Sequence, residues 1–353
     1  MSAPTEPTTN VNLNAIAEHL NLSTATVSRA LRNVPGTHPR TKSLVMNAAA
    51  ELGYRPQRTR TRAGGRPQTQ SVGVLARGLR SGRSLAFLEG MTQSAGDLDV
   101  SVMMQRIGYD EGDNDFGDLK NELARIDNLA GIALIHRWPV EIVRYLSDQF
   151  DCVSLIHYYP GLPVDVVDMN HGQGMTQLVN RLYELGHRRI GFVGRNAELS
   201  WAKARFGGYS QILYSLGLPY NPEWIVDVPT PMLEDTNLVE LWKPTIERVY
   251  ALIEDGVTAW VASSDWAGYA LCRGLLDLGL RVPEDISITG FDTDEPQTLG
   301  CPRLTSVNIP KPQMGAESLR RLLRRREDPQ QPQHTSLFGC ALFAGQTTAA
   351  PPA

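Results

Sequence analysis

The sequence lacks the features that would place the chain in or across a membrane. Its 353 residues contain no run of 18 apolar side chains, and the first ten residues have neither the basic region nor the apolar stretch of a secretory signal. We therefore expect a cytoplasmic protein without a membrane partner.

Cysteine is scarce and scattered. The four cysteines, Cys152, Cys272, Cys301 and Cys340, include no Cys-x-x-Cys pair. This spacing offers no zinc site, and in a reducing compartment the four side chains are expected to be ordinary thiols rather than disulfides. We predict no metal and no cofactor.

Motifs of common enzyme classes are also missing. The sequence has no Gly-x-Ser-x-Gly, no phosphate-binding Gly-Lys-Ser/Thr loop and no His cluster with metal-ligand spacing. Asp265 and Asp292 could act as the acid and base of a glycoside hydrolase, but a role as hydrogen-bond acceptors is the simpler interpretation. We expect a protein that is not an enzyme, and turnover of a glycoside would contradict this.

The charge is distributed unevenly. Residues 1–70 contain nine Lys or Arg against three Glu, which is +6, so the rest of the chain carries −10 of the total of −4. A basic module on an acidic body suits a polyanionic partner that only the module touches. An incidentally basic surface is the alternative.

After a polar tail at residues 1–10, three short helical patterns follow. Apolar residues recur at helical spacing over 13–20, a second helix begins after the N-cap candidate Ser23, and a third covers 40–52 and ends at Gly53. Two helices joined by a short turn and supported by a third predict a helix-turn-helix unit over 11–56.

The second of these helices has a polar face opposite its apolar one. Arginine can bond guanine with two hydrogen bonds, and short hydroxyls reach phosphates or base edges in the major groove. A solvated helix face is the alternative, but the short turn and the N-cap favour DNA binding. The residues of this face are Thr24, Ala25, Ser28, Arg29 and Arg32.

Residues 11–31 and the run Ala50-Glu-Leu-Gly-Tyr-Arg-Pro56 resemble the start and end of the head of the lactose-repressor (LacI/GalR) family of bacterial regulators. The resemblance implies that Thr24, Ala25 and Arg29 occupy base-reading positions. It places at phosphate-contacting or orienting positions Asn12, Ser23, Thr26, Ser28 and Tyr54. The implied partner is an operator that is an imperfect palindrome, bound by a homodimer, with a tetramer left open.

Residues 57–70 form a basic linker almost without apolar side chains. In the family this segment becomes a short helix with a leucine wedge, but here the aligned position is Ala63, followed by Gly64 and Gly65, which disfavour a helix. Arg60 and Arg62 could enter the minor groove instead.

From residue 71 to residue 345, short β-rich runs alternate with amphipathic helices, which predicts parallel sheets in an α/β core. The resemblance continues here and implies a two-lobed core like that of periplasmic sugar-binding proteins. Lobe one is expected at about 71–168 and 311–328, and lobe two at about 169–309 and 333–345, followed by a tail at 346–353. The fold class is therefore an all-α helix-turn-helix head plus a two-lobed α/β core.

The strands are expected at 72–76, 100–105, 131–135, 153–156, 189–193, 259–262 and 286–290. The helices are expected near 85–96, 116–128, 139–149, 174–185, 201–216, 235–255, 266–279 and 312–326.

Four polar residues of the core match positions that the family uses around its ligand. Arg205 resembles an arginine that faces the cleft, Asp265 matches the Asp of an Asn-Asp pair in which Ser264 replaces the Asn, and Asp292 ends a predicted strand. A guanidinium suits vicinal hydroxyls or a carboxylate, and carboxylates accept hydrogen bonds from hydroxyls. The alternative for each is an ion pair across the lobes.

Trp138, Trp201 and Trp266 lie in or beside predicted strand-end loops. Aromatic faces stack on the C–H faces of sugars, so this set favours a carbohydrate effector. The function predicted is a repressor of carbohydrate-use genes that a sugar releases from its operator. A nucleobase or other corepressor, an activator, and a periplasmic transport receptor are the alternatives; the head and the missing signal peptide count against the last.

Overall fold

The computed structural model describes residues 13–31, 39–52, 70–76, 82–106, 123, 128–228, 238–293 and 300–352. The chain divides into two compact units, Met1–Arg66 and Pro67–Ala353. The expected helix at 116–128 and the expected linker at 57–70 lie almost entirely outside the described residues. Among the described residues, no helix is both long and apolar enough to cross a membrane.

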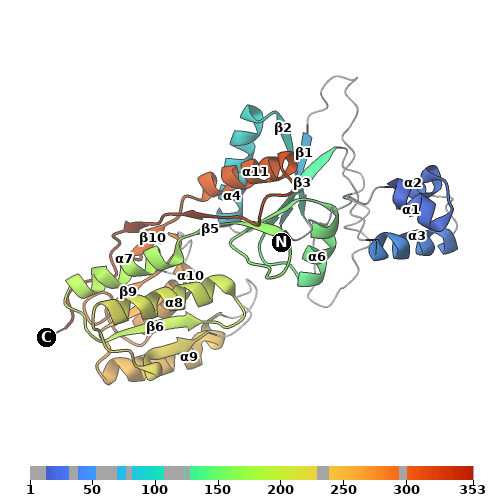
Figure 1. The fold of residues 1–353 in the computed structure, drawn as a ribbon. Helices are drawn as coiled ribbons and strands as arrows, with labels where there is room; N and C mark the ends of the chain where they lie inside the picture. The colour runs from blue at the N-terminus through green and yellow to red at the C-terminus, as the bar shows by residue number, and fades with distance from the viewer. Residues whose placement is uncertain are drawn as a thin grey trace, which may run out of the picture. The chain divides into compact units, whose positions relative to one another are not determined.

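The first unit is built from the three helices that the apolar pattern predicts: α1 (Leu13–Leu20), α2 (Thr24–Leu31) and α3 (Pro39–Glu51), drawn in blue in Figure 1. Asn21, with a φ of 52°, turns the chain between α1 and α2. The side chains that share the small core are Ile16, Ala17, Val27, Ala30, Val45, Ala48 and Ala49. Every helix therefore contributes its apolar face to one cluster, as a helix-turn-helix unit requires.

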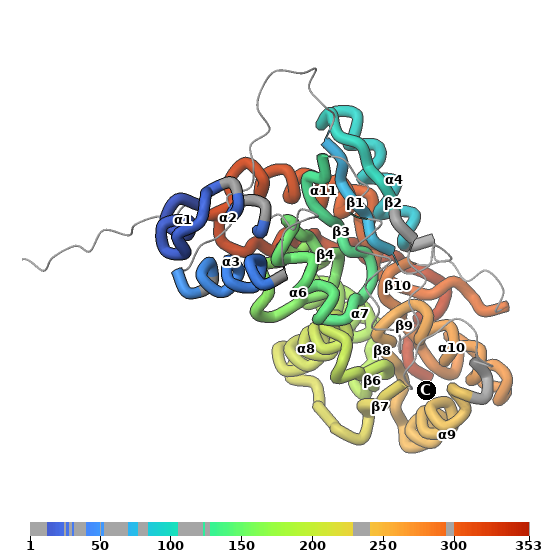
Figure 2. The backbone as a smooth tube through the Cα atoms, turned by 90° about the vertical axis from the view of Figure 1, so that its right-hand side faces the viewer, coloured from blue at the N-terminus to red at the C-terminus, as the bar shows by residue number. Residues whose placement is uncertain are grey.

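The first lobe of the second unit contains a six-stranded parallel sheet in the order β11-β5-β4-β3-β1-β2. Helices α4 and α11 pack together on one face, and α6 covers the other (Figures 1 and 2). Successive residues of β1 show why both faces are apolar: Val74 belongs to the cluster under α4 and α11, and Leu75 to the cluster under α6. The elements are β1 (Gln70–Ala76), α4 (Gly82–Asp97), β2 (Val100–Arg106), β3 (Leu129–Ile135), α6 (Val140–Gln149), β4 (Cys152–Leu155), β5 (Val164–Met169), α11 (Lys311–Glu327) and β11 (Thr335–Phe338).

The second lobe contains a four-stranded parallel sheet in the order β7-β6-β8-β9. Helices α7 and α8 pack on one face, and α9 and α10 on the other. The elements are α7 (His171–Glu184), β6 (Ile190–Arg195), α8 (Ser200–Ser215), the 3-10 turn η1 (Pro222–Trp224), β7 (Ile225–Asp227), α9 (Leu238–Glu254), β8 (Ala259–Ala262), α10 (Asp265–Asp277) and β9 (Ser287–Thr289).

The chain passes between the lobes three times. It leaves the first sheet after β5, returns between β10 (Ser306–Asn308) and α11, and crosses again between β11 and β12 (Ala341–Phe343), which pairs antiparallel with β10. The backbone N–H of Asn170 donates to the carbonyl of Phe338 at 2.7 Å, so two of the crossings are hydrogen-bonded to each other. This arrangement forms a hinge between two lobes.

The C-terminal segment departs from the prediction. Residues 333–345 were expected in lobe two; β12 does pair with β10 there, but β11 pairs with β5 in the sheet of lobe one. Residues 346–353 were expected as a tail. Instead Thr347 is fully buried, and its carbonyl accepts from the N–H of Ile288 at 2.8 Å.

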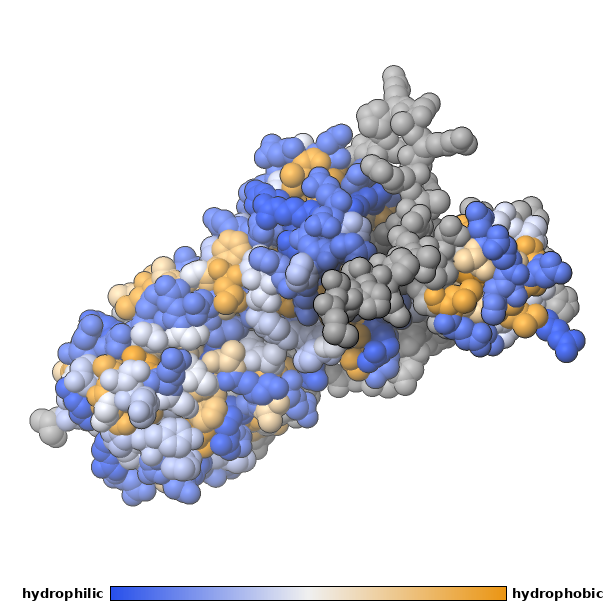
Figure 3. All heavy atoms as spheres, in the orientation of Figure 1, coloured by the Kyte–Doolittle hydropathy of each residue, from blue (hydrophilic) through white to orange (hydrophobic). Residues whose placement is uncertain are grey.

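Hydrophobic residues of the second unit that reach the surface lie in small patches among hydrophilic ones on the face drawn in Figure 3. The remaining predicted elements agree with the observed ones within a few residues, apart from the strands β5, β7, β10, β11 and β12, which the apolar pattern did not predict.

Candidate functional site

The recognition-helix candidate α2 begins at a side-chain cap. Ser23 Oγ accepts a hydrogen bond from the backbone N–H of Thr26 at 3.1 Å, and the two hydroxyl oxygens lie 2.8 Å apart. Val27 and Ala30 point into the core, while Thr24 is exposed. The cap and the buried face fix both the start and the rotation of α2.

The remaining residues predicted to contact DNA are less fully described. Ala25, Ser28 and Arg29 lie on α2. Those outside the described residues are Asn12, Arg32, Tyr54, Arg60 and Arg62. Their roles stay predictions.

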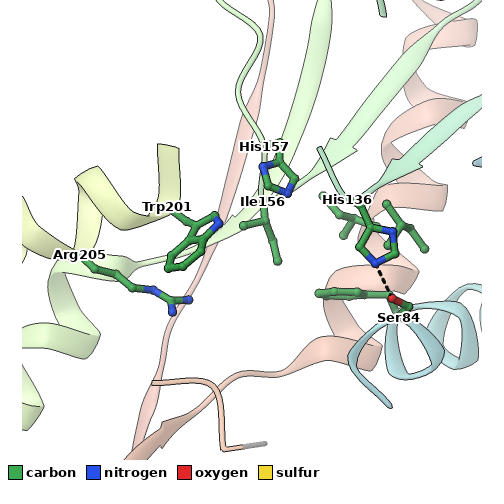
Figure 4. Close-up of a pocket in the computed structure, with 9 residues that line it drawn as sticks. Ser84, His136, Ile156, His157, Trp201 and Arg205 are labelled. Atoms are coloured by element: carbon green, nitrogen blue, oxygen red, sulfur yellow. Dashed lines mark hydrogen bonds between the residues drawn. The ribbon is translucent and has the colours of Figure 1, made fainter. Parts of the chain in front are cut away.

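A pocket lies between the two lobes of the second unit, where β3 and β4 end and α8 begins (Figure 4). It holds about 430 Å³ of space, part of it open to solvent. We call it the cleft pocket, and its lining residues are Ser84, Phe87, Ile135, His136, Leu155, Ile156, His157, Trp201 and Arg205. Parallel sheets place ligands at the carboxyl ends of their strands, and the cleft pocket occupies that position.

The backbone is strained around the cleft pocket. His136 and Ile156, which directly follow β3 and β4, have φ values of 75° and 73°, and Asp292, which follows β9 and binds Arg205, has a φ of 118°. For a β-branched residue such as Ile156 a positive φ is a genuine outlier. Such conformations persist only where the surrounding fold imposes them, and they gather at ligand sites.

Arg205 lies on α8 and is 2% exposed. Its Nη2 and Nη1 donate to the two carboxylate oxygens of Asp292 at 2.7 and 3.3 Å, so this buried ion pair forms within lobe two. The sequence had left open an ion pair across the lobes as the alternative to ligand contact, whereas this pair lies within one lobe. Nη1 also donates to the carbonyl of Ser263 at 2.6 Å, and Nε to His171 Nδ1 at 3.2 Å.

The fifth N–H of Arg205 points from Nη2 to the sulfur of Met169 at 3.4 Å. A guanidinium has five N–H groups, so the protein itself engages all of them. Arg205 Cζ, the central carbon of the guanidinium, lies 3.7 Å from the ring centre of Phe291 and 4.9 Å from that of Trp201. Arg205 therefore lines the cleft pocket mainly as a support that holds Trp201, rather than as a free donor.

On the opposite wall, the hydroxyl of Ser84 lies 2.8 Å from His136 Nε2 (Figure 4). Ser84 is in the first turn of α4 and is almost completely buried, whereas His136 and His157 are half-buried. The cleft pocket thus offers two imidazoles and a hydroxyl on one side and the indole of Trp201 on the other.

Five of the predicted effector residues do not line the cleft pocket. Trp138 is 1% exposed and donates from Nε1 to the carbonyl of Ile135, and Trp266 packs edge-on against Trp242 in lobe two. Ser264 caps α10 by accepting from the N–H of Ala267 at 3.2 Å.

Asp265 is equally occupied, because its Oδ1 accepts from Ser306 Oγ at 2.6 Å. Asp292 faces Arg205. Of the seven predicted effector residues, Trp201 and Arg205 line the cleft pocket, and the roles of the other five stay predictions.

Sequence reasoning missed the lobe-one side of the cleft pocket. His136 and His157 come directly after the predicted strands of residues 131–135 and 153–156. The strand-end rule that selected Asp292 would have selected them as well, whereas nothing in the sequence shows that Ser84 faces His136.

Two family models match the chain. Residues 12–57 match "Bacterial regulatory proteins, lacI family", and residues 179–348 match "Periplasmic binding protein-like domain". Among curated relatives, the HTH-type transcriptional repressor CytR of Escherichia coli (strain K12) is 28% identical over 344 residues, covering 96% of each chain. Catabolite control protein A of Priestia megaterium is 26% identical over 329 residues, covering 89% of this chain and 92% of the relative.

Solved structures share the fold over nearly the whole chain. A complex of the transcriptional regulator CelR with cellobiose has a TM-score of 0.66 at 23% identity and covers 96% of this chain and 99% of its own. The lac repressor dimer bound to operator and the anti-inducer ONPF has a TM-score of 0.64 at 22% identity, covering 97% and 100%.

The head and the α/β core with parallel sheets are therefore confirmed, and the relatives are regulators rather than enzymes. The chain thus carries a head that matches the lacI family model and a periplasmic-binding-protein-like domain, and it is similar over nearly its whole length to DNA-binding transcription regulators of that family.

Proposed function

We propose that this chain is a cytoplasmic homodimeric repressor of carbohydrate-use genes, released from an imperfectly palindromic operator when a sugar binds in the cleft pocket. The observation that carries the proposal is the cleft pocket itself, with Trp201 from lobe two facing His136 and His157 from lobe one. A ligand that touches both walls would bind one lobe angle better than another, and only such differential binding can shift a conformational equilibrium.

The lining favours a sugar. The indole of Trp201 can stack on the C–H face of a pyranose, while the imidazoles accept or donate hydrogen bonds at its hydroxyls. Phe87 and Leu155 supply apolar contacts beside them. The similar CelR structure, which is a complex with cellobiose, is consistent with this chemistry. A nucleobase, which also stacks on indole, is the second candidate.

The ligand can be tested by a thermal-shift screen of the full chain with mono- and disaccharides, cellobiose among them, and with purine bases. Binding to the folded state raises the melting temperature by mass action. We expect Trp201→Ala to weaken binding of the hit about fivefold, since an aromatic stacking contact contributes about 1 kcal/mol. Tyr214→Ala is the matched control, because Tyr214 lies on the same helix and is 88% exposed.

A shift only with purines would replace the sugar by a nucleobase. Equal affinity of the hit for Trp201→Ala and Tyr214→Ala would place the ligand outside the cleft pocket.

DNA reading by α2 predicts a second result. Arg29→Ala should lose about 1–3 kcal/mol of operator affinity and relax base preference at one position of each half-site. Gel-shift titration at fixed salt measures both effects, because the electrostatic part of binding depends on salt. Arg320→Ala removes the same charge from an exposed position on α11 and should leave affinity unchanged. If the two variants bind alike, α2 is not the base-reading helix.

A further inference from the structure

Two of the four cysteines lie next to each other in lobe two. Cys272 is a fully buried residue of α10, and its thiol is hydrogen-bonded to the sulfur of Cys301. Cys301 lies outside any helix or strand and is only half-buried. The pair therefore has one inner sulfur and one that solvent can reach.

The segment that carries Cys301 is held along α10 at several points. The Cys301 sulfur lies 3.9 Å from the carbonyl oxygen of Tyr269, one helical turn before Cys272. The backbone N–H of Leu304 donates to the Tyr269 hydroxyl at 3.2 Å. These contacts hold the Cys301 segment against the turn of α10 that carries Tyr269 and Cys272.

A cation stands next to this pair. Arg273 follows Cys272 on α10, and its Nη1 lies close to Gly300, the residue before Cys301: a Cβ built on Gly300 would be 3.7 Å from it. Arg273 Nε donates to Asp277 at 3.0 Å. The hydrogen bond from Cys272 lowers the pKa of the Cys301 thiol below its usual value, against an opposing effect of burial, and the charge of Arg273 lowers it further. The same hydrogen bond and burial raise the pKa of Cys272. Cys301 is thus the more accessible of the two sulfurs, and its pKa is the one that is lowered.

We propose that Cys272 and Cys301 form a peroxide-sensitive dithiol that closes to an intramolecular disulfide. The Cys301 thiolate attacks one oxygen of hydrogen peroxide, which breaks the O–O bond and leaves a sulfenic acid on Cys301 and, after protonation, one water. The Cys272 thiol then attacks that sulfur, its proton passes to the departing hydroxide, and a second water leaves. Two thiols are oxidised by two electrons, and one peroxide is reduced to two waters.

The other two cysteines provide the contrast. Cys152 and Cys340 are both buried, and burial raises the pKa of Cys340 to about 11. Their thiols donate hydrogen bonds to backbone carbonyls, that of Cys152 to Phe150 and that of Cys340 to Asn170. The oxidation should therefore be selective for the Cys272–Cys301 pair.

The test treats the reduced full-length protein with graded hydrogen peroxide, alkylates the remaining thiols and maps the peptides by mass spectrometry. We expect one product, a Cys272–Cys301 cross-link lighter by two hydrogen atoms, with Cys152 and Cys340 still alkylated. Dithiothreitol should restore all four thiols. Because this measurement uses the parent protein, its result does not depend on the correct folding of any variant.

Variants then separate the two steps. Cys272→Ser should leave a sulfenic acid on Cys301 that dimedone traps, Cys301→Ser should not react, and the double control Cys152→Ser/Cys340→Ser should react like the parent. Arg273→Gln should slow the reaction several-fold. A disulfide between two chains, oxidation of Cys301 without cross-linking, or equal oxidation of Cys152 and Cys340 would each overturn the proposal.

Discussion

Arg205→Met should lower the free energy of unfolding by about 3–5 kcal/mol, and Asp292→Asn should have a similar effect, because each variant leaves a partner group buried without its counter-charge. Arg205 and Asp292 are 2% and 1% exposed, so water cannot solvate the remaining charge. Thermal and urea unfolding of the full chain measure the loss, and the transition of the second unit should show it.

The double variant Arg205→Met/Asp292→Leu should be less destabilised than the sum of the single variants, because it removes both buried charges together. The matched control is Arg195→Met. Arg195 also makes two hydrogen bonds to one carboxylate, that of Asp227, at 2.7 and 3.0 Å. This pair is exposed, so it should contribute at most about 1 kcal/mol to the free energy of unfolding.

This result bears on the proposed ligand. If Arg205 supports Trp201 and offers no free N–H, loss of ligand binding in Arg205→Met should come together with loss of stability. A variant that keeps the parent melting temperature but no longer binds the ligand would show that the guanidinium contacts the ligand directly, as the sequence alone had suggested.

The head could be predicted from sequence because its information is local. The spacing of Ile16 and Ala17, the cap at Ser23 and the inward residues Val27 and Ala30 each act within one or two helical turns. The central strands of the two parallel sheets could also be predicted, because strands buried on both faces appear in the sequence as continuous runs of apolar residues.

The C-terminal strands could not be predicted, because their information is not local. Thr335–Phe338 is short, alternates exposed with half-buried residues, and exists as a strand only through pairing with β5, about 170 residues earlier. The same holds for the site. Nothing near Arg205 in the sequence shows that Ser263, Asp292 and His171 engage its guanidinium.

A second buried cluster fixes this C-terminal strand to the first lobe. Asp165, on β5, accepts hydrogen bonds from Arg321 Nε at 2.7 Å and from Arg325 at 2.6 and 2.8 Å. It also accepts from the backbone N–H of His334 at 2.8 Å, directly before β11. One carboxylate therefore ties α11 and β11 to the sheet.

Removing that carboxylate charge should destabilise the second unit as strongly as breaking the pair at Arg205. Asp165→Asn leaves two guanidiniums, of Arg321 and Arg325, almost fully buried with no anion between them, so we expect a loss of about 3–5 kcal/mol at neutral pH. Backbone amides of Thr335–Phe338 should exchange hydrogen faster than in the parent, because the anchor before β11 is weakened. Asp277→Asn, at an exposed carboxylate that also pairs with an arginine, is the control and should leave the stability almost unchanged, because solvent screens that pair.

Acid dependence gives an independent measure of the same carboxylate. Burial alone would raise the pKa of Asp165, but the hydrogen bonds from Arg325, the His334 backbone and Arg321 outweigh it and hold the pKa below its usual value. A carboxyl whose pKa is lower in the folded than in the unfolded state contributes stability that is present above the unfolded pKa of about 4 and is lost as the pH falls through the folded one. The free energy of unfolding of the parent, measured with urea, should therefore fall steeply as the pH drops below about 4. For Asp165→Asn, the free energy of unfolding should depend less steeply on pH over the same window. Identical slopes in the two proteins, or parent-like stability of Asp165→Asn at neutral pH, would mean that the three charged side chains do not anchor the C-terminal strand.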